Sequence, residues 1–255
     1  MKKTIRYILL TVCVCVFCYS AYNLIQIYLN YKKIDDDYGE IAKTYTEEKV
    51  EEKESYLQIN WDELLQRNKD VKAWIQIPNT NVNYPVLQGE TNDTYIHSDI
   101  DHNELSAGSI FIASENEDPF NDFNTVIYGH NMKNGTMFAD LNKYKDKEFY
   151  ESHKEVQFDT LTEEGTYKVV YALVTEVNKK DSFKYYEKIN WNSKNEFNEY
   201  VSNLEQRKLY DTGEKIKKKD KLLTLSTCEK ASDNSRMVVV CKKVKSMTDN
   251  GQEDL

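Results

Sequence analysis

The region between residues 71 and 244 is built from short segments in which apolar and polar residues alternate. A period of two is typical of β-strands, and segments rich in Asn, Asp and Gly separate the runs. The expected strands are 71–77, 82–88, 109–113, 125–130, 155–160, 167–177, 221–228 and 236–244. Eight short strands with few helices between them favour a sheet that closes on itself. We therefore predict a mainly β protein with a closed eight-stranded barrel.

Helical patterns precede and interrupt these strands. Residues 32–58 are charged and contain no Pro and a single Gly, which predicts a helical stalk. Asn60 followed three residues later by Glu63 resembles a capping box and predicts a short helix over 61–68. A further short helix is expected over 137–144.

A longer helix is expected to begin at Ser193, with Glu196 as its capping partner. Its apolar residues recur at i, i+3, i+4 and i+7, which places them on a single stripe. These residues are Phe197, Tyr200, Val201 and Leu204. The stripe is expected to pack on the barrel, so this helix is an insertion before the strand 221–228.

The N-terminal segment 7–29 is apolar and carries no charge. A helix of that length spans about 30 Å of hydrocarbon. Basic residues precede the segment, at Lys2, Lys3 and Arg6, so the N-terminus is expected in the cytoplasm and the rest of the chain outside the cell. We predict a single-pass anchor in the cell membrane.

Two kinds of cleaved N-terminal signal are less consistent with this segment. A signal peptide is the main alternative, but the apolar stretch is long and Ser20-Ala21 matches a small-x-small cleavage site poorly. A lipoprotein signal needs a small residue before its cysteine, whereas Val12 precedes Cys13 and Phe17 precedes Cys18. The uncleaved anchor therefore remains the preferred interpretation.

Composition excludes one class of partner. The chain carries 43 acidic and 34 basic residues, a formal net charge of −9. Such a surface repels nucleic acid, so we expect none as a partner. The basic run 217–219 is interpreted as a solvated turn.

The five cysteines divide into two groups. Three of them lie in the apolar anchor, namely Cys13, Cys15 and Cys18. Cys228 and Cys241 lie outside it, where an exported pair invites a disulfide. If Arg236 lies opposite Cys228 in a hairpin, Cys241 is about 16 Å further along the strand. A disulfide needs Cα atoms within about 7 Å, so Cys241 is predicted in the core and Cys228 as a free thiol.

Three reactive side chains stand at the ends of expected strands: Cys228, His130 and Arg236. A thiol attacks as its thiolate, which an imidazolium or a guanidinium stabilises. Arginine stays protonated and suits the binding of a developing oxyanion, while histidine can pass a proton to a leaving amine. The set suffices for cysteine acyl transfer. A cysteine at a strand end is, however, more often a packing residue, so a non-catalytic surface barrel remains an alternative.

Around these residues the chain resembles the sortases, membrane-anchored cysteine transpeptidases of Gram-positive bacteria. The resemblance rests on Thr224-Leu225-Ser226-Thr227-Cys228, on Ser235-Arg236-Met237-Val238-Val239 and on Tyr128-Gly129-His130. It covers about residues 70–246, and the order His, Cys, Arg fits as well. It implies a closed eight-stranded sortase-like β-barrel with N-terminal helices and an inserted helix before the cysteine strand. It also implies that His130, Cys228 and Arg236 are catalytic.

The subclass resembled is class B. Its features here are an N-terminal helical extension over 34–69, an insertion with a helix over 180–215, and the groove segment 92–96. By this likeness the substrate-binding residues are Asn92, Ile96, Ser226, Thr227 and Glu229. An acidic residue just past the cysteine is also expected in class B, and Asp233 is the candidate because Lys230 and Ala231 follow Glu229.

The resemblance implies a reaction. Cys228 attacks the Thr carbonyl of a sorting motif near the C-terminus of a secreted protein. The resulting thioester is resolved by an amine of a peptidoglycan precursor or cross-bridge, which anchors the surface protein to the cell wall. No cofactor is expected. A cysteine peptidase that hydrolyses the same kind of peptide remains an alternative, because the acceptor site is not visible in the sequence.

A metal site is not expected. His97, Asp99, Asp101 and His102 mix imidazoles with carboxylates, but they fall in a loop without a second cluster to complete four ligands. We interpret the segment as a solvated turn, and His153 as a surface residue.

The expected domain organisation has five parts. They are a cytoplasmic tail (1–6), a transmembrane anchor (7–29), a helical stalk with N-terminal helices (30–69), a sortase catalytic domain (70–248) and a polar tail (249–255).

Overall fold

The structure is a computed structural model that describes residues 2–51, 54–177, 182–228 and 234–246. Of Cys228 it describes the backbone alone. Glu229 and Asp233, two residues predicted near the site, lie outside the described residues. The chain divides into two compact units, Met1–Ile41 and Ala42–Leu255.

The N-terminal unit belongs to one continuous helix, α1 (Lys2–Tyr45). By its length and composition the helix is long and apolar enough to cross a membrane. It contains the predicted segment 7–29 and continues into the charged residues beyond it. The prediction of a helical segment is confirmed up to Tyr45.

The expected helical stalk is wrong over its second half. Residues there form a β-hairpin of β1 (Thr46–Glu51) and β2 (Glu54–Ile59), paired antiparallel with Thr46 opposite Ile59. Thr46, Val50 and Ile59 are β-branched and favour extended backbone. The charge-rich composition concealed this preference, because charged residues are compatible with an exposed helix as well as with an exposed hairpin.

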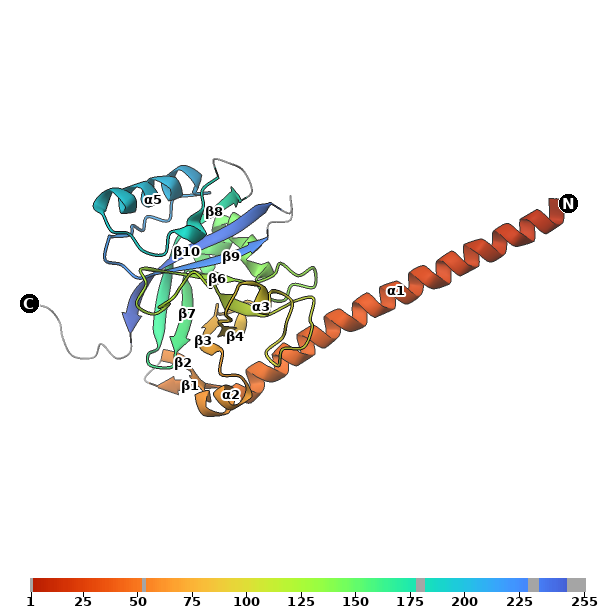
Figure 1. Ribbon diagram of the computed structural model, residues 1–255, viewed down its shortest axis with the longest axis horizontal. Coiled ribbons are helices and arrows are strands. Elements are labelled where there is room, and N and C mark those ends of the chain that lie inside the picture. Colours follow the sequence, from red (N-terminus) through yellow and green to blue (C-terminus); the bar gives the residue numbers. More distant parts are fainter. Residues whose placement is uncertain (1, 52–53, 178–181, 229–233, 247–255) are drawn as a thin grey trace, which may run out of the picture. The chain divides into compact units, whose positions relative to one another are not determined.

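Eight strands form a closed barrel in the order β10-β8-β7-β3-β4-β5-β6-β9 (Figure 1). Their bounds are β3 (Val71–Gln76), β4 (Asn83–Leu87), β5 (Ile110–Ile112), β6 (Asn124–Tyr128), β7 (Glu155–Thr160), β8 (Gly165–Glu176), β9 (Leu222–Cys228) and β10 (Ser235–Ser246). The pairs β4–β5 and β6–β9 are parallel and the other barrel pairs are antiparallel. The predicted closed barrel and its strands are confirmed, apart from small shifts at their ends.

In the described part of the chain, six helical segments lie between or before the barrel strands: α2 (Trp61–Arg67), α3 (Asp93–Ile96), η1 (Ala139–Lys145), α4 (Lys147–Ser152), η2 (Tyr185–Glu187) and α5 (Lys194–Arg207). The Asn60 side chain accepts a hydrogen bond from the Glu63 backbone N–H at 3.3 Å, which confirms the predicted cap of α2. The helix expected over 137–144 is the 3-10 helix η1, which begins at Ala139. The sequence pattern did not reveal α3, α4 or η2.

The inserted helix α5 is capped as predicted. The Ser193 hydroxyl accepts from the Glu196 backbone N–H at 3.1 Å, while the Glu196 carboxylate accepts from the Asn192 backbone N–H at 2.8 Å. Its apolar stripe packs against β8 and β10 in one cluster, in which Phe197, Tyr200 and Leu204 are buried and Val201 is partly buried. Because α5 covers this part of the sheet, β10 is buried on both faces between Met237 and Cys241.

Cys241 lies in this buried run with no exposed surface and carries a free thiol. Burial raises the pKa of the thiol, so it stays protonated at neutral pH. Its prediction as a core residue is confirmed.

Candidate active site

Three strand ends meet at one end of the barrel. β6 runs parallel to β9 with Tyr128 opposite Ser226, and the next residue, Gly129, donates its N–H to the Ser226 carbonyl at 3.2 Å. β9 runs antiparallel to β10 with Cys228 opposite Arg236. Positions directly opposite in an antiparallel pair belong to the same face of the sheet. The barrel thus brings the three predicted catalytic positions to one place from separate parts of the chain.

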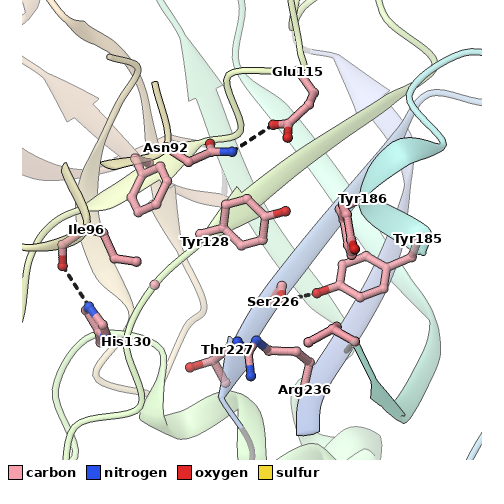
Figure 2. Close-up of a pocket in the computed structure, with 13 residues that line it drawn as sticks. Asn92, Ile96, Glu115, Tyr128, His130, Tyr185, Tyr186, Ser226, Thr227 and Arg236 are labelled. Carbon is pink, nitrogen blue, oxygen red and sulfur yellow. Dashed lines mark hydrogen bonds between the residues drawn. The ribbon is translucent and has the colours of Figure 1, made fainter. Parts of the chain in front are cut away.

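A cavity of about 300 Å³ opens at these strand ends (Figure 2). Its lining contains His130 and Arg236 together with the four predicted groove residues that the structure describes with side chains, Asn92, Ile96, Ser226 and Thr227. The sequence analysis had not placed the remaining lining residues in the groove, which are Phe111, Glu115, Tyr128, Gly129, Val177, Tyr185 and Tyr186. Most of them come from β5, from the β8 end and from η2, which the barrel and its insertion bring together.

His130 is half-buried, and its Nε2 lies 2.7 Å from the Ile96 carbonyl oxygen. A carbonyl only accepts, so Nε2 donates and Nδ1 is the basic nitrogen of the neutral ring. Burial holds the pKa of His130 below its ordinary value, and the nearby His97 and Arg236 lower it further, while the Ile96 carbonyl opposes the shift. The neutral imidazole therefore predominates at neutral pH.

His97 is a neighbour of His130 that the sequence analysis had assigned to a solvated turn. The two rings stack, with centroids 5.6 Å apart and planes 17° from parallel. His97 is itself exposed and directly follows α3. The prediction that His97 lies in an exposed turn is confirmed. Its stacking on the His130 ring is visible only in the tertiary structure.

Replacing His97 with glutamine is expected to raise the pKa of His130, because the protonated His97 ring repels a second imidazolium. More His130 is then protonated at pH 7. An NMR titration of the His130 ring measures the change directly. His153→Gln is the matched control, since the His153 ring packs on Phe149 instead. An unchanged or lower pKa of His130 in His97→Gln would contradict the coupling.

Arg236 lies half-buried in the cavity wall, and its Nη1 donates to the Ser235 carbonyl at 3.1 Å. Burial is the main cause of the pKa shifts of two other lining residues, because it lowers the pKa of His130 and raises that of Tyr128. The charge of Arg236 adds to the lowering at His130 and opposes the rise at Tyr128. The guanidinium is thus the fixed positive charge beside the Cys228 position.

The hydroxyls of Ser226 and Thr227 have different surroundings. The Ser226 Oγ lies 2.6 Å from the Tyr185 hydroxyl, so it is engaged within the protein. The Thr227 hydroxyl is buried and has no hydrogen-bond partner in the described part of the chain. An unpaired buried polar group is costly, so Thr227 is the better suited of the two to bind a polar group of a ligand.

Asn92 lines the other side of the cavity and is fixed there by two hydrogen bonds. Its Nδ2 donates to the Glu115 carboxylate at 2.9 Å, and its Oδ1 accepts from the Ser114 backbone N–H at 2.9 Å. These bonds join α3 to the segment after β5 and fix both side chains. Glu115 has no local sequence signal that would mark it, because it is one acidic residue in an acidic loop.

A buried network fixes the segment that carries Ile96 and His97. The Tyr95 side chain has no exposed surface, and its hydroxyl accepts from Asn68 at 2.9 Å and donates to Asp70 at 2.7 Å. The backbone that holds His130 is therefore tied to the end of α2 and the start of β3. Burial also raises the pKa of the Tyr95 hydroxyl, which keeps it a donor.

Replacing Tyr95 with phenylalanine is expected to lower the free energy of unfolding by about 1–3 kcal/mol, because Asn68 and Asp70 lose a buried partner. Chemical denaturation measures this. The Asp70→Asn substitution in both backgrounds completes a double-mutant cycle. Equal costs of Asp70→Asn in the two backgrounds would show that the hydroxyl bond contributes nothing.

The charged residues of the loop after α3 form ion pairs and hydrogen bonds that stabilise the loop. Asp101 forms a bidentate pair with Arg67, at 2.8 and 2.7 Å, and Asp99 accepts from the Asp101 and Asn103 backbone N–H groups at 2.8 Å. Among the described residues no group of three or more His, Cys, Asp or Glu side chains is arranged to hold a metal ion.

Comparison with known proteins agrees with this geometry. The family model of the sortase domain matches residues 75–244. Sortase B of Listeria monocytogenes is 38% identical over 186 residues, which is 71% of this chain and 73% of the relative. Sortase B of Staphylococcus aureus is 30% identical over 247 residues, which is 96% of this chain and 98% of the relative.

A solved Staphylococcus aureus sortase B–substrate complex superposes with a TM-score of 0.66 at 32% identity, covering 73% of this chain and 85% of that one. The fold, the family match and both relatives point to the same class. The chain therefore belongs to the sortase family and is a class B sortase, a cysteine transpeptidase that anchors surface proteins.

Proposed function

We propose that this enzyme cleaves a sorting motif near the C-terminus of secreted proteins after a Thr residue and transfers the acyl group to an amine of a cell-wall peptide. The observation that carries the proposal is the cavity of about 300 Å³ that His130, Thr227 and Arg236 line at the point where Cys228 lies opposite Arg236 in register. The Staphylococcus aureus sortase B whose fold matches this chain has been solved as a substrate complex, which supports a substrate-binding role for the same fold here.

The first half-reaction forms a thioester. A proton moves from the Cys228 thiol to the neutral His130 imidazole, which gives a thiolate and an imidazolium. The thiolate attacks the Thr carbonyl carbon, and the π electrons of the C=O bond move to its oxygen, beside the Arg236 guanidinium. When the tetrahedral intermediate collapses, the C–N bond breaks and the His130 imidazolium gives its proton to the leaving amine. The products are an acyl-enzyme and a neutral amine at the new N-terminus of the released segment.

The second half-reaction breaks the thioester, and the proton now moves from an amine to His130. The amine of a peptidoglycan precursor or cross-bridge attacks the thioester carbonyl while neutral His130 takes its proton. The thiolate leaves, and a new amide joins the surface protein to the cell wall. Water in place of the amine would make the same enzyme a peptidase.

The groove roles of Asn92, Ile96, Ser226 and Thr227 are part of this proposal, because these residues line the cavity around the reacting positions. Glu229 and Asp233 keep their proposed roles, as a groove residue and an assisting acid, from the class B resemblance alone. Both lie outside the described residues.

We also propose the topology and the domain boundaries. The basic residues before the apolar part of α1 favour a cytoplasmic N-terminus, with residues 7–29 in the membrane and the catalytic domain, residues 70–248, outside the cell. A catalytic domain on that side of the membrane meets both secreted proteins and the cell wall. Residues 1–6, 30–69 and 249–255 then form the cytoplasmic tail, the membrane-proximal region and the C-terminal tail.

The test uses full-length protein in detergent micelles with a library of sorting-motif peptides, with and without an amine acceptor. Intact-mass spectrometry follows adducts on Cys228, and Cys228→Ala is the blank. An adduct that the amine converts to a ligated peptide supports transpeptidation after Thr. An adduct that water resolves equally fast with and without amine supports the peptidase, and no adduct with any peptide contradicts both.

A further inference from the structure

The loop of residues 97–109 leaves the end of α3 and returns to it before β5 begins. The backbone N–H of Ser109 donates to the Tyr95 carbonyl at 3.0 Å, and its hydroxyl donates to the Ser98 carbonyl at 2.8 Å. Ser109 has no exposed surface. The end of the loop is therefore fixed against the last turn of α3, which contains Ile96.

Gly108 lies directly against the Ile96 peptide. A Cβ atom at Gly108 would lie 2.3 Å from the Ile96 carbonyl oxygen and 2.7 Å from its carbonyl carbon, which is closer than real Cβ atoms come to their neighbours. Gly108 also has a φ of +55°, in the left-handed region that favours glycine. The close contact and the backbone conformation therefore both require glycine here.

The Ile96 carbonyl is the hydrogen-bond partner of His130, the proposed carrier of the proton. It accepts from His130 Nε2 at 2.7 Å (Figure 2). This bond decides which ring nitrogen of the neutral imidazole carries the proton and leaves Nδ1 to accept one. In nucleophilic catalysis a third group commonly orients the base. Because that group is a backbone carbonyl here, its position depends on the chain that packs against it.

We propose that Gly108 is a positioning residue for His130, because the lack of a side chain lets the loop close on the Ile96 peptide while the carbonyl still points at Nε2. A side chain at this position would push the loop and the peptide apart. Tyr95 is fixed by its buried hydrogen bonds and Ser109 by its own, so the displacement falls on the Ile96 carbonyl. This inference rests on the proposed function, since it concerns the proton transfer assigned to His130.

The test replaces Gly108 with alanine in the full-length enzyme in detergent micelles. Gly213→Ala is the matched control, since Gly213 has a φ of +77° and a Cβ there would meet no atom of the described residues within 4 Å. Both substitutions place alanine in left-handed backbone, but only Gly108→Ala brings a Cβ against a carbonyl. Nitrogen-15 NMR follows the His130 ring, with His130→Gln to assign its signals, and turnover of a sorting-motif peptide gives kcat and KM.

In Gly108→Ala the neutral His130 ring is expected to change from the Nε2–H tautomer to a mixture of tautomers, and kcat to fall about 10- to 100-fold. The loss should appear mainly in kcat, because Gly108 does not line the cavity. Gly213→Ala should keep the wild-type tautomer and kcat. Both variants should lose unfolding free energy, because alanine is strained at a positive φ.

The pKa of His130 gives a second readout. Burial lowers this pKa and the Ile96 carbonyl opposes the shift, so a weaker bond to the carbonyl should lower the pKa further. His97 and Arg236 also lower it, and the substitution changes neither of them. A loss of stability without displacement of the carbonyl would leave the pKa unchanged.

A folded Gly108→Ala enzyme that keeps the Nε2–H tautomer and the wild-type kcat would overturn the inference. If Gly108→Ala does not fold, Ser109→Ala replaces it in the test, because it removes the hydroxyl bond to Ser98 and loosens the same loop. Ser109→Ala should change the tautomer and the pKa of His130 in the same direction by a smaller amount. An unchanged ring in that variant would overturn the inference too.

The two proposals fail in different ways. The tautomer and the pKa are measured without substrate, so a changed His130 ring in Gly108→Ala supports the positioning role even if no peptide acylates Cys228, which would refute the reaction. Efficient acylation and ligation by the wild type, together with an unchanged ring in Gly108→Ala, leaves transpeptidation standing and refutes the positioning role.

Discussion

Replacing Cys228 with alanine is expected to lower the rate of peptide cleavage by at least about 10⁴-fold, since losing the nucleophile removes the whole acyl-enzyme route. In the proposed mechanism Arg236 polarises a carbonyl and His130 moves a proton, but neither forms the thioester. Turnover of a quenched fluorescent sorting-motif peptide measures the loss, and intact mass verifies that no adduct accumulates.

Cys241→Ala is the control for this substitution. Cys241 lies five residues past Arg236 on β10, fully buried, with its thiol pKa raised by burial. The variant is expected to keep wild-type turnover and to lose on the order of 1 kcal/mol of unfolding free energy from the small cavity created. Turnover that survives in Cys228→Ala would show that cleavage does not require the Cys228 thiol and would contradict its role as the nucleophile.

Replacing Arg236 with lysine is expected to lower kcat about 100-fold, the usual cost of losing an oxyanion donor. Lysine preserves the charge but presents a compact ammonium in place of a planar fork of N–H donors, so it does not match the geometry of the developing oxyanion. The loss should appear mainly in kcat, because the contact strengthens in the transition state.

Arg207→Lys makes the same chemical change away from the cavity. Arg207 ends α5, where its Nη1 donates to the backbone carbonyl and the side chain of Asn203. Its turnover should match wild type. If Arg236→Lys also keeps wild-type turnover, the planar fork of N–H donors does not stabilise the transition state. Arg236 would then contribute only its positive charge.

The groove was the least predictable part of the site. Asn92 and Ile96 were expected there from a resemblance, and both line the cavity. Glu115, Tyr185 and Tyr186 were not expected, because each lies in a loop or a short helical turn without periodicity. The same limit applies to His97, which was correctly assigned to an exposed loop but whose stacking on His130 no local pattern encodes.

Sequence alone determined the barrel strands, the α5 stripe and the burial of Cys241. These features follow from local rules, because alternation reflects the two faces of a strand and a spacing of three to four residues reflects one face of a helix. Local rules were insufficient between Thr46 and Ile59, where exposed charged residues fit a helix and a hairpin equally well.

Tertiary structure alone decided which side chains meet. Cys228 and Arg236 are opposite positions in the register of β9 and β10, whereas His130 lies near them only because β6 pairs in parallel with β9 as the barrel closes. The contacts of Asn92 with Glu115, of Tyr95 with Asp70 and of Tyr185 with Ser226 join residues separated by 23, 25 and 41 positions. Contacts over such separations depend on how the barrel closes and where its insertions fold back, which periodicity along the chain does not specify.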